Sequence, residues 1–467
     1  MISVCLNASL EGETMSSETE NREIQQYPGA PGAAPFWNPS SCSKPDIVTA
    51  IPLIRQNRMI LSFIAFMGVC LIAMSFLYNT PRDILQGSLN ILTSPANLLT
   101  DYFQLANIGA TLMNVGIICL ISVTLIWVNK VSVTGSIIAA VFTMIGFSFF
   151  GKNLYNTFPI ILGVLLYAKA VKHPFRQYIL HSMFGTALSP LVSEFSFNLG
   201  LPIPFGILLG IVSGIIAGFI LVPLSSQVLK FHQGYSLYNI GFTAGLIGMF
   251  FTALLRGFGI EIEAVSILST DRNTGLIVFL YALFALLFIL GFITNRGRLT
   301  GFRCLLAQTG VLPSDFLSTS GLGVTAMNMS LMGIISTTYV LAIGGVLNGP
   351  VLGAIFTVVG FSAYGKHIKN SIPILIGVML TNVFNIHDSS ATFAIIAALF
   401  GMTLAPIAGE YGILAGILAG VLHMSLVTNI GFLHAGMNLY NNGFSGGFVA
   451  AFLVPLLEMV RPHKPSN

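Results

Sequence analysis

A run of glycine, proline and polar residues occurs twice in this chain, at residues 142–164 and again, without a gap in the match, at residues 356–378. Both copies contain Gly-Phe-Ser-x-x-Gly-Lys, followed by an asparagine, a proline and a Gly-Val pair. Further matches extend from Arg82 and Arg296 to the end of each half. A chain duplicated in this way folds as two similar units, and many transporters place a shared site between such units.

Little of the chain is suited to contact with water. Hydrophobic residues make up 54% of it, charged residues 8%, and the mean hydropathy is +0.85, whereas soluble domains carry about 25% charged residues. Since one crossing takes about 20 apolar residues, the sequence predicts an all-α polytopic membrane protein with about 14 membrane segments. The predicted segments are 58–78, 105–128, 131–150, 155–171, 178–193, 204–229, 236–256, 274–294, 321–344, 349–365, 371–386, 391–408, 411–432 and 438–460.

The same runs predict the domain organisation. Residues 1–48 are rich in Ser, Glu, Asn, Gly and Pro, a composition typical of disorder, and are predicted to form a cytoplasmic tail. Residues 49–260 form the first membrane repeat, and 261–273 an external connecting loop. The second membrane repeat covers 274–460, and a cytoplasmic C-terminal tail covers 461–467.

The positive charges predict how the two repeats are oriented. If all segments cross and the amino terminus is cytoplasmic, sixteen of the 20 Lys and Arg residues fall inside. The four outside are Arg82, Lys152, Arg256 and Arg272. An odd number of crossings per half then gives two inverted-topology repeats of about seven segments in the cell membrane, with both termini cytoplasmic. Re-entrant or broken helices in both halves would preserve that parity.

The repeated run supplies the first candidate site residues. Its glycines and proline interrupt a membrane helix, and free backbone groups at membrane depth are tolerated where they line a cavity or are covered by protein. Ser148, Asn156, Ser362 and Asn370 are therefore predicted to face a solute between the halves. In the alternative, the run is a short loop with ordinary helix caps.

Ionisable residues supply further candidates, because charges at membrane depth are costly and usually functional. Lys152 and Lys366 could reach inward to attract an anionic group or to gate a pathway; the alternative is that both extend to the membrane surface. Glu194 and Glu410 could bind a coupling ion or exchange a proton. The alternative for Glu194 is that it begins a loop.

A second repeated element, Leu-Tyr-Asn-x-Gly-Phe, begins the last segment of each half. Tyr238, Asn239, Tyr440 and Asn441 could line a pathway with hydroxyl and amide groups. Equally, the asparagines could cap helices and the tyrosines could lie in the interfacial aromatic belt.

Three histidines lie close to these candidates in the sequence. His232 and His434 precede the Leu-Tyr-Asn element and are interpreted as solvated residues at segment ends. His423, inside an apolar run, is interpreted as a core histidine with its hydrogen bonds satisfied.

The two repeated elements resemble an uncharacterised bacterial integral-membrane family known only as a domain of unknown function, which implies no activity. The segment Gly234 to Gly245, with its second copy from Gly436 to Gly447, is also similar to one that urea transporters carry in both halves. That resemblance implies a symmetric pathway for a small solute. The chain departs from it by its larger number of predicted segments and by lacking the Leu-Pro-x-Phe-Thr-Leu-Pro-Phe signature.

Transport of a small polar solute, by a facilitator or an ion-coupled carrier, is the predicted function. Phosphate-binding, zinc-protease and Cys-x-x-Cys motifs are absent from the sequence, so we expect no catalytic residue, metal or cofactor. The expected partners are the lipid bilayer, the solute and, in a carrier, a coupling ion. The sequence leaves a homo-oligomer open and has no basic tract for nucleic acid. The alternatives are a membrane enzyme acting on a lipid or lipid-linked substrate, and a sensory or scaffolding membrane protein.

Overall fold

Helices make up nearly all of the structure, which is a computed structural model describing residues 51–95, 99–262, 265–384 and 388–460. The two predicted tails lie outside these described residues. In the first half the helices are α2 (Leu53–Tyr78), α3 (Pro81–Thr93), α4 (Tyr102–Leu105), α5 (Ile108–Val128), α6 (Gly135–Phe147), α7 (Leu154–Ala170), η2 (Phe175–Tyr178), α8 (Ile179–Gly185), η3 (Thr186–Leu188), α9 (Ser189–Phe197), α10 (Ile203–Phe231) and α11 (Asn239–Gly257).

The second half repeats this order. Its helices are α12 (Thr274–Thr294), α13 (Phe302–Leu305), α14 (Phe316–Ala342), α15 (Gly349–Phe361), α16 (Ile368–Phe384), α17 (Thr392–Gly401), η4 (Met402–Leu404), α18 (Ala405–Tyr411), α19 (Ile413–Ile430), η5 (Gly431–Leu433) and α20 (Asn441–Met459). Two short strands, β1 (Leu99–Thr100) and β2 (Ser266–Ile267), pair in parallel.

The helices support a polytopic membrane protein. Every predicted apolar segment contains helix, and nine helices in the described residues are long and apolar enough to cross a membrane. Helices α6 and α15 have 13 residues each, or about 20 Å at 1.5 Å per residue, which is shorter than a hydrocarbon core of about 30 Å. The number of crossings therefore stays a prediction.

The fifth segment of each half is a broken helix, so broken helices, which the sequence left open, occur at 178–193 and 391–408. A 3-10 turn, η3 or η4, separates α8 from α9 and α17 from α18. Each break precedes a proline, Pro190 or Pro406, at the start of the following helix. Proline has no backbone N–H to donate to the preceding turn, so a carbonyl in the turn is free to bond elsewhere.

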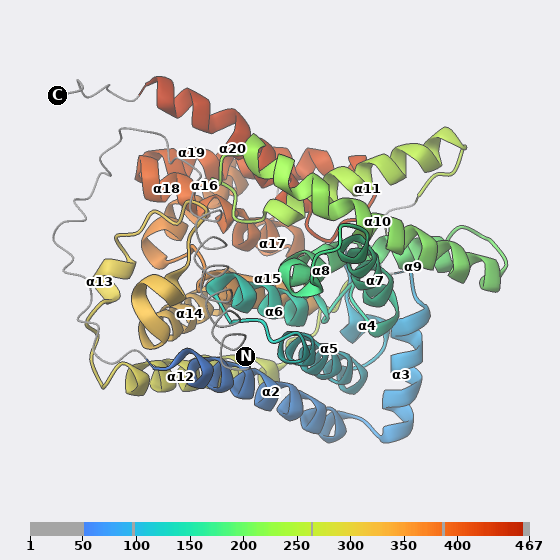
Figure 1. The fold of residues 1–467 in the computed structure, drawn as a ribbon, viewed down its shortest axis with the longest axis horizontal. Helices are drawn as coiled ribbons and strands as arrows, with labels where there is room; N and C mark the ends of the chain where they lie inside the picture. The colour runs from blue at the N-terminus through green and yellow to red at the C-terminus, as the bar shows by residue number, and fades with distance from the viewer. Residues whose placement is uncertain (1–50, 96–98, 263–264, 385–387, 461–467) are drawn as a thin grey trace, which may run out of the picture. The chain divides into compact units, whose positions relative to one another are not determined.

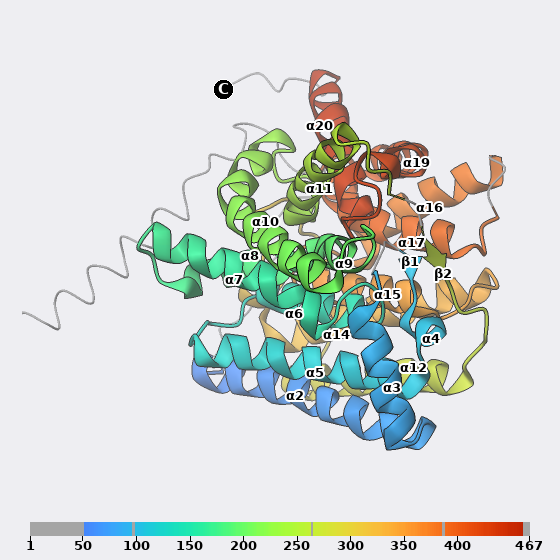
Figure 2. The same cartoon turned by 90° about the vertical axis from the view of Figure 1, so that its right-hand side faces the viewer.

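Helices α6 and α15 lie against each other at the centre of the described unit, between α2, α5 and α12 on one side and α10, α11, α19 and α20 on the other (Figures 1 and 2). They run in opposite directions, since Gly135 at the start of α6 meets the Ala363 carbonyl after α15. Phe142 and Phe356, which are equivalent in the repeat, meet with ring centroids 6.2 Å apart. The two copies of the repeated run thus pack directly on each other.

Two aspartates connect the halves at the ends of this helix pair. Asp315 accepts from the backbone N–H of Gly135 at the start of α6, at 3.1 Å. Its equivalent, Asp101, accepts from the backbone N–H of Gly349 at the start of α15, and from Ser269 at 3.0 Å. Burial raises the pKa of Asp101 to about 6, against the opposing effect of these backbone bonds. Each half therefore bonds the first backbone N–H of the other half's central helix, whose own N-cap is Thr134 or Asn348.

Candidate functional site

Lys152 and Lys366 lie inside the protein, each with a relative exposure of 0%. Lys152 Nζ donates to the Tyr440 hydroxyl at 3.1 Å, and Lys366 Nζ donates to the Tyr238 hydroxyl at 2.6 Å. Both bonds join a lysine of one half to a tyrosine of the other. The alternative that these lysines extend to the membrane surface is wrong, because their side chains are fully buried.

Aromatic rings surround both ammonium groups. Lys152 Nζ lies 5.2 Å from the ring centroid of Phe147 and 5.1 Å from that of Tyr440. The equivalent distances from Lys366 are 5.4 Å to Phe361 and 4.5 Å to Tyr238. Ring faces attract cations at such distances, the more so where water is excluded.

Phe400 links the two lysine environments. Its ring stacks on Phe147 at 5.4 Å and lies 6.2 Å from the ring of Tyr238. An unbroken series of contacts thus joins the two ammonium groups through side chains of both halves. The lysine-tyrosine cluster comprises Lys152, Lys366, Tyr238, Tyr440, Phe147, Phe361 and Phe400.

The two ammonium groups have unused hydrogen-bonding capacity. An ammonium has three donors, yet Lys366 Nζ bonds only the Tyr238 hydroxyl, and Lys152 Nζ adds only a 3.9 Å contact with the Met144 sulfur. Within the described ranges neither lysine is paired with a carboxylate. A buried ammonium without a counter-ion is costly, which marks these positions as functional candidates.

Two asparagines outside the predicted site residues, Asn114 and Asn328, bond the backbone around the two lysines. Asn114 Nδ2 donates to the carbonyls of Ser148 and Lys152, at 2.8 and 2.9 Å. Asn328 Nδ2 makes the same two bonds to Ser362 and Lys366, at 2.7 and 2.8 Å. The repeated pair Met-Asn at 113–114 and 327–328 is the sequence signal that could have identified them.

The other candidate residues of the repeated run bond to backbone, and Asn156 Nδ2 donates in addition to the Ser193 hydroxyl at 3.0 Å. The hydroxyls of Ser148 and Ser362 donate to carbonyls one turn earlier, at 2.6 and 2.7 Å. The amides of Asn156 and Asn370 donate to the carbonyls of the glycines just before the two lysines, both at 2.9 Å. All four are buried and serve the loop geometry, as the cap interpretation has it. Their role in a pathway stays a prediction.

The broken helices fix the tyrosines of the cluster. Leu237 N–H donates to the Thr403 carbonyl in η4 at 3.1 Å, and Leu439 N–H donates to the Ala187 carbonyl in η3 at 3.0 Å. Each tyrosine directly follows one of these leucines. The aromatic-belt interpretation is wrong for both, because Tyr238 is only 6% exposed and Tyr440 only 7%.

A sequence profile of a known family matches residues 80–257 and again residues 294–459, one region in each half. Its description is "Protein of unknown function (DUF1576)". The chain belongs to the DUF1576 family. No curated protein and no solved structure matches the chain. The predicted resemblance to an uncharacterised family is therefore confirmed, whereas the similarity to urea transporters gains no support from these comparisons.

In this DUF1576 protein a histidine is hydrogen-bonded to the asparagine of each Leu-Tyr-Asn element. His232 Nε2 lies 3.0 Å from Asn239 Oδ1, and His434 Nε2 lies 2.9 Å from Asn441 Oδ1. Both histidines have a relative exposure of 0%, so their interpretation as solvated residues is wrong. The asparagine amides also donate to carbonyls of the preceding helices, at 3.2 and 3.3 Å, which makes these residues structural.

The two glutamates of the DUF1576 protein differ. Glu194 is only 1% exposed and lies within α9, so the alternative that it begins a loop is wrong. Its Oε1 accepts from Asn198 Nδ2 at 2.6 Å, while Oε2 has no hydrogen-bond partner among the described residues. Glu410 is half-buried in α18. A cation or proton site at either residue stays a prediction, and the described part of the chain has no group of three metal-ligating side chains.

Proposed function

We propose that this protein moves a small polar solute across the membrane, through a site between two inverted repeats. The lysine-tyrosine cluster is the observation that carries the proposal. It combines two buried lysines that have unused donors with hydrogen bonds that join one half to the other. Ionisable groups buried between membrane helices typically mark a solute or ion pathway.

Two further observations support inverted repeats. The central helices α6 and α15 are antiparallel and bring equivalent residues into contact, as a pseudo-two-fold axis in the membrane plane requires. The charge bias also survives the burial of Lys152 and Lys366. Removing these two residues leaves fifteen Lys and Arg inside and three outside in the predicted topology.

In the proposed cycle each lysine-tyrosine bond acts as a gate. The described arrangement, with both bonds formed, corresponds to a closed state. Opening toward one face separates one pair and frees an ammonium and a hydroxyl for the solute. Because both groups favour an acceptor, we expect the solute to carry an anionic or strongly accepting group. Glu194, with one oxygen unpaired, is the proposed site for a coupling proton or cation.

Flux into proteoliposomes tests the proposal, with a panel of small radiolabelled carboxylates, inorganic anions and neutral polar solutes. For a solute that the wild type transports, we expect Lys152→Met and Lys366→Met each to lower the rate by about tenfold or more, which is a loss of at least about 1.4 kcal/mol of binding or barrier energy. Lys169→Met is the matched control, because Lys169 is exposed on α7, and it should transport normally.

Substituted cysteines give a test that needs no solute. In a background without the native cysteines, Thr403→Cys beside Tyr238 should react with a membrane-impermeant thiol reagent from one face and Ala187→Cys from the other. Reaction of both from the same face would contradict inverted access. A folded, monodisperse protein that transports no member of the panel and protects both cysteines from both faces would overturn the transport proposal. Uptake that ignores sodium and proton gradients would remove the coupled version.

A further inference from the structure

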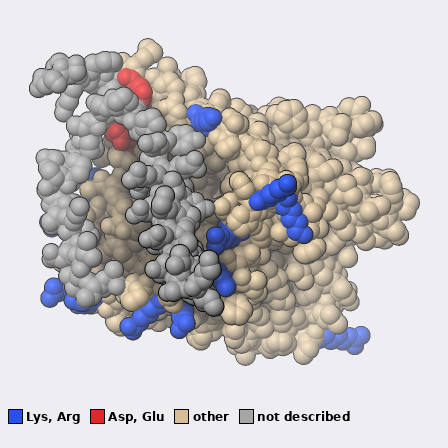
Figure 3. Space-filling view, viewed as in Figure 1, with Lys and Arg blue, Asp and Glu red and all other residues tan. Residues whose placement is uncertain are grey.

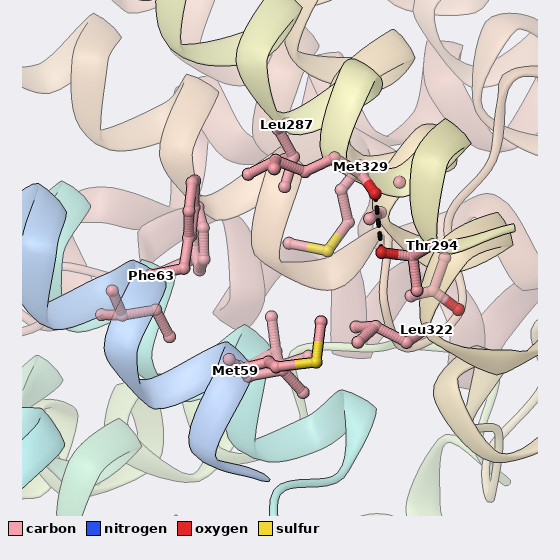
Figure 4. A pocket seen from close by; sticks show the side chains of 14 residues that line it. Met59, Phe63, Leu287, Thr294, Leu322 and Met329 are labelled. Atoms are coloured by element: carbon pink, nitrogen blue, oxygen red, sulfur yellow. Dashed lines mark hydrogen bonds between the residues drawn. The ribbon is translucent and has the colours of Figure 1, made fainter. Parts of the chain in front are cut away.

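An apolar cavity of about 250 Å³ lies away from the lysine-tyrosine cluster, between α2, α6, α12 and α14. Figure 4 shows Met59 and Phe63 of α2 facing Leu287 of α12 and Met329 of α14 across it. Two of its lining residues, Met59 and Leu290, are each 40% exposed at the surface. A flexible apolar group could therefore enter from the surface.

The cavity offers no free polar group to a ligand. Its two hydroxyl side chains are already bonded, Thr294 to the Leu290 carbonyl at 2.7 Å and Thr325 to the Phe316 carbonyl at 2.9 Å. The other lining side chains are aliphatic, aromatic or thioether groups, apart from Gly291. A polar solute would lose its hydration there without gaining hydrogen bonds, so the lining suits a hydrocarbon chain.

Arginines gather at the end of the cavity marked by Met59 and Thr294. Arg55 lies one turn before Met59 on the same face of α2. Arg58 directly precedes Met59 and lies about 100° around the helix from it. Arg298 follows the end of α12 just beyond Thr294. All three arginines are exposed, and Lys and Arg side chains are visible along the lower left of the surface, where α12 lies (Figure 3).

We infer that this cavity binds one acyl chain of an anionic phospholipid, whose phosphate lies among Arg55, Arg58 and Arg298. The charge favours this occupant: a neutral lipid would fill the cavity equally well but would gain nothing from Arg55 and Arg58 on α2 and Arg298 just after α12. Basic pockets between membrane helices recognise anionic head groups in this way. The arginines lie on the predicted cytoplasmic side, where anionic lipid is attractive to them.

Native mass spectrometry tests the inference on the full-length protein, reconstituted in nanodiscs of equal phosphatidylglycerol and phosphatidylcholine and then released. The wild type should retain phosphatidylglycerol over phosphatidylcholine by about fivefold or more, equivalent to about 1 kcal/mol. The triple variant Arg55→Gln, Arg58→Gln, Arg298→Gln should lose the preference. A matched triple, Arg82→Gln, Lys172→Gln, Arg176→Gln, removes three charges elsewhere and should keep it.

Filling the cavity tests the acyl half of the inference. Ala326→Leu places a larger side chain in the lining and should remove the retained lipid while the arginines stay in place. Equal retention of both lipids by the wild type, an unchanged preference in the arginine triple, or equal loss in the control triple would each overturn the inference. So would full retention in a folded Ala326→Leu variant. If that variant does not fold, the comparison of the arginine triple with the control triple still tests the inference.

Discussion

The two halves of this protein are alike around the lysine-tyrosine cluster and differ in a buried network beside α19. At the interface, Lys152 bonds Tyr440 and Lys366 bonds Tyr238, with matching rings and matching asparagine clamps. At His423 and its hydrogen-bond partners, the halves have diverged. The preserved part therefore reflects a requirement of the assembled pair, since each tyrosine serves the lysine of the other copy.

A buried polar network in the second half gives the clearest contrast. His423 Nε2 lies 3.0 Å from Asn442 Oδ1, and its Nδ1 lies 3.0 Å from Ser445 Oγ. This bears out its interpretation as a satisfied core histidine. The packing of the first half places Leu221 and Ile240 at the positions of His423 and Asn442, since Gly185 faces Leu221 where its equivalent Gly401 faces His423. One copy thus fills this space with apolar side chains and the other with a hydrogen-bonded triad.

The largest expected effect tests the shared interface. Asn114→Ala and Asn328→Ala each remove two buried hydrogen bonds to backbone carbonyls. Each should lower the free energy of unfolding by about 2 to 4 kcal/mol, because the carbonyls stay buried without a donor. Denaturant unfolding in mixed micelles measures this, with exposed Asn90→Ala as the control. A large loss in one half alone would break the proposed equivalence.

A smaller effect concerns Asp101 and Asp315, the two aspartates that bond the central helix of the opposite half. It appears as a pH dependence of the free energy of unfolding. The Asp101 pKa is about 6 in the folded protein against 3.8 for the free carboxyl, so the folded state binds the proton more tightly. The wild-type stability, relative to Asp101→Asn, should therefore fall as pH rises from about 4 to about 6, by about 2 kcal/mol.

Burial also raises the pKa of Asp315, which predicts the same direction for Asp315→Asn. Unfolding measured at several pH values in one detergent separates the two residues. A difference between wild type and Asp101→Asn that is constant with pH, or that grows toward pH 6, would contradict the sign.

The smallest effect probes the part that has diverged. Ser445→Ala removes a hydrogen bond to His423, whereas the equivalent Thr243→Ala removes only a bond to a carbonyl of its own helix. We expect a loss of about 1 kcal/mol for Ser445→Ala and less for Thr243→Ala. A double-mutant cycle of Ser445→Ala with His423→Ala should show coupling of about 0.5 kcal/mol or more. Additive losses would mean that the triad is no network.

The sequence predicts the elements well and their partners poorly. Apolar runs locate the helices because lipid demands long apolar stretches, and the spacing of Gly-Phe-Ser-x-x-Gly-Lys reveals the duplication. Neither pattern reports that Lys152 lies opposite Tyr440, because 288 residues separate them. The same limit explains the errors at His232 and His434, whose burial depends on packing against α11 and α20.

Some local features also escaped prediction. The 3-10 turn before Pro190 interrupts a run whose hydropathy is continuous, so only the proline could have indicated it. Asn114 looks in the sequence like one polar residue inside a membrane helix. Its repeated neighbour Met113 shows that it was duplicated, but the two carbonyls that it binds become visible only in three dimensions.

The bonds from Asp101 and Asp315 to the central helix of the opposite half have a consequence for synthesis of the chain. The backbone N–H of Gly135 at the start of α6 bonds Asp315, which is 180 residues further along the chain. At about 5 to 20 residues per second, the ribosome takes about 9 to 36 seconds to add that length. The first half therefore spends this interval in the membrane without this bond at the start of its central helix, where Thr134 is the only cap of its own, and gains the bond when the second half is made.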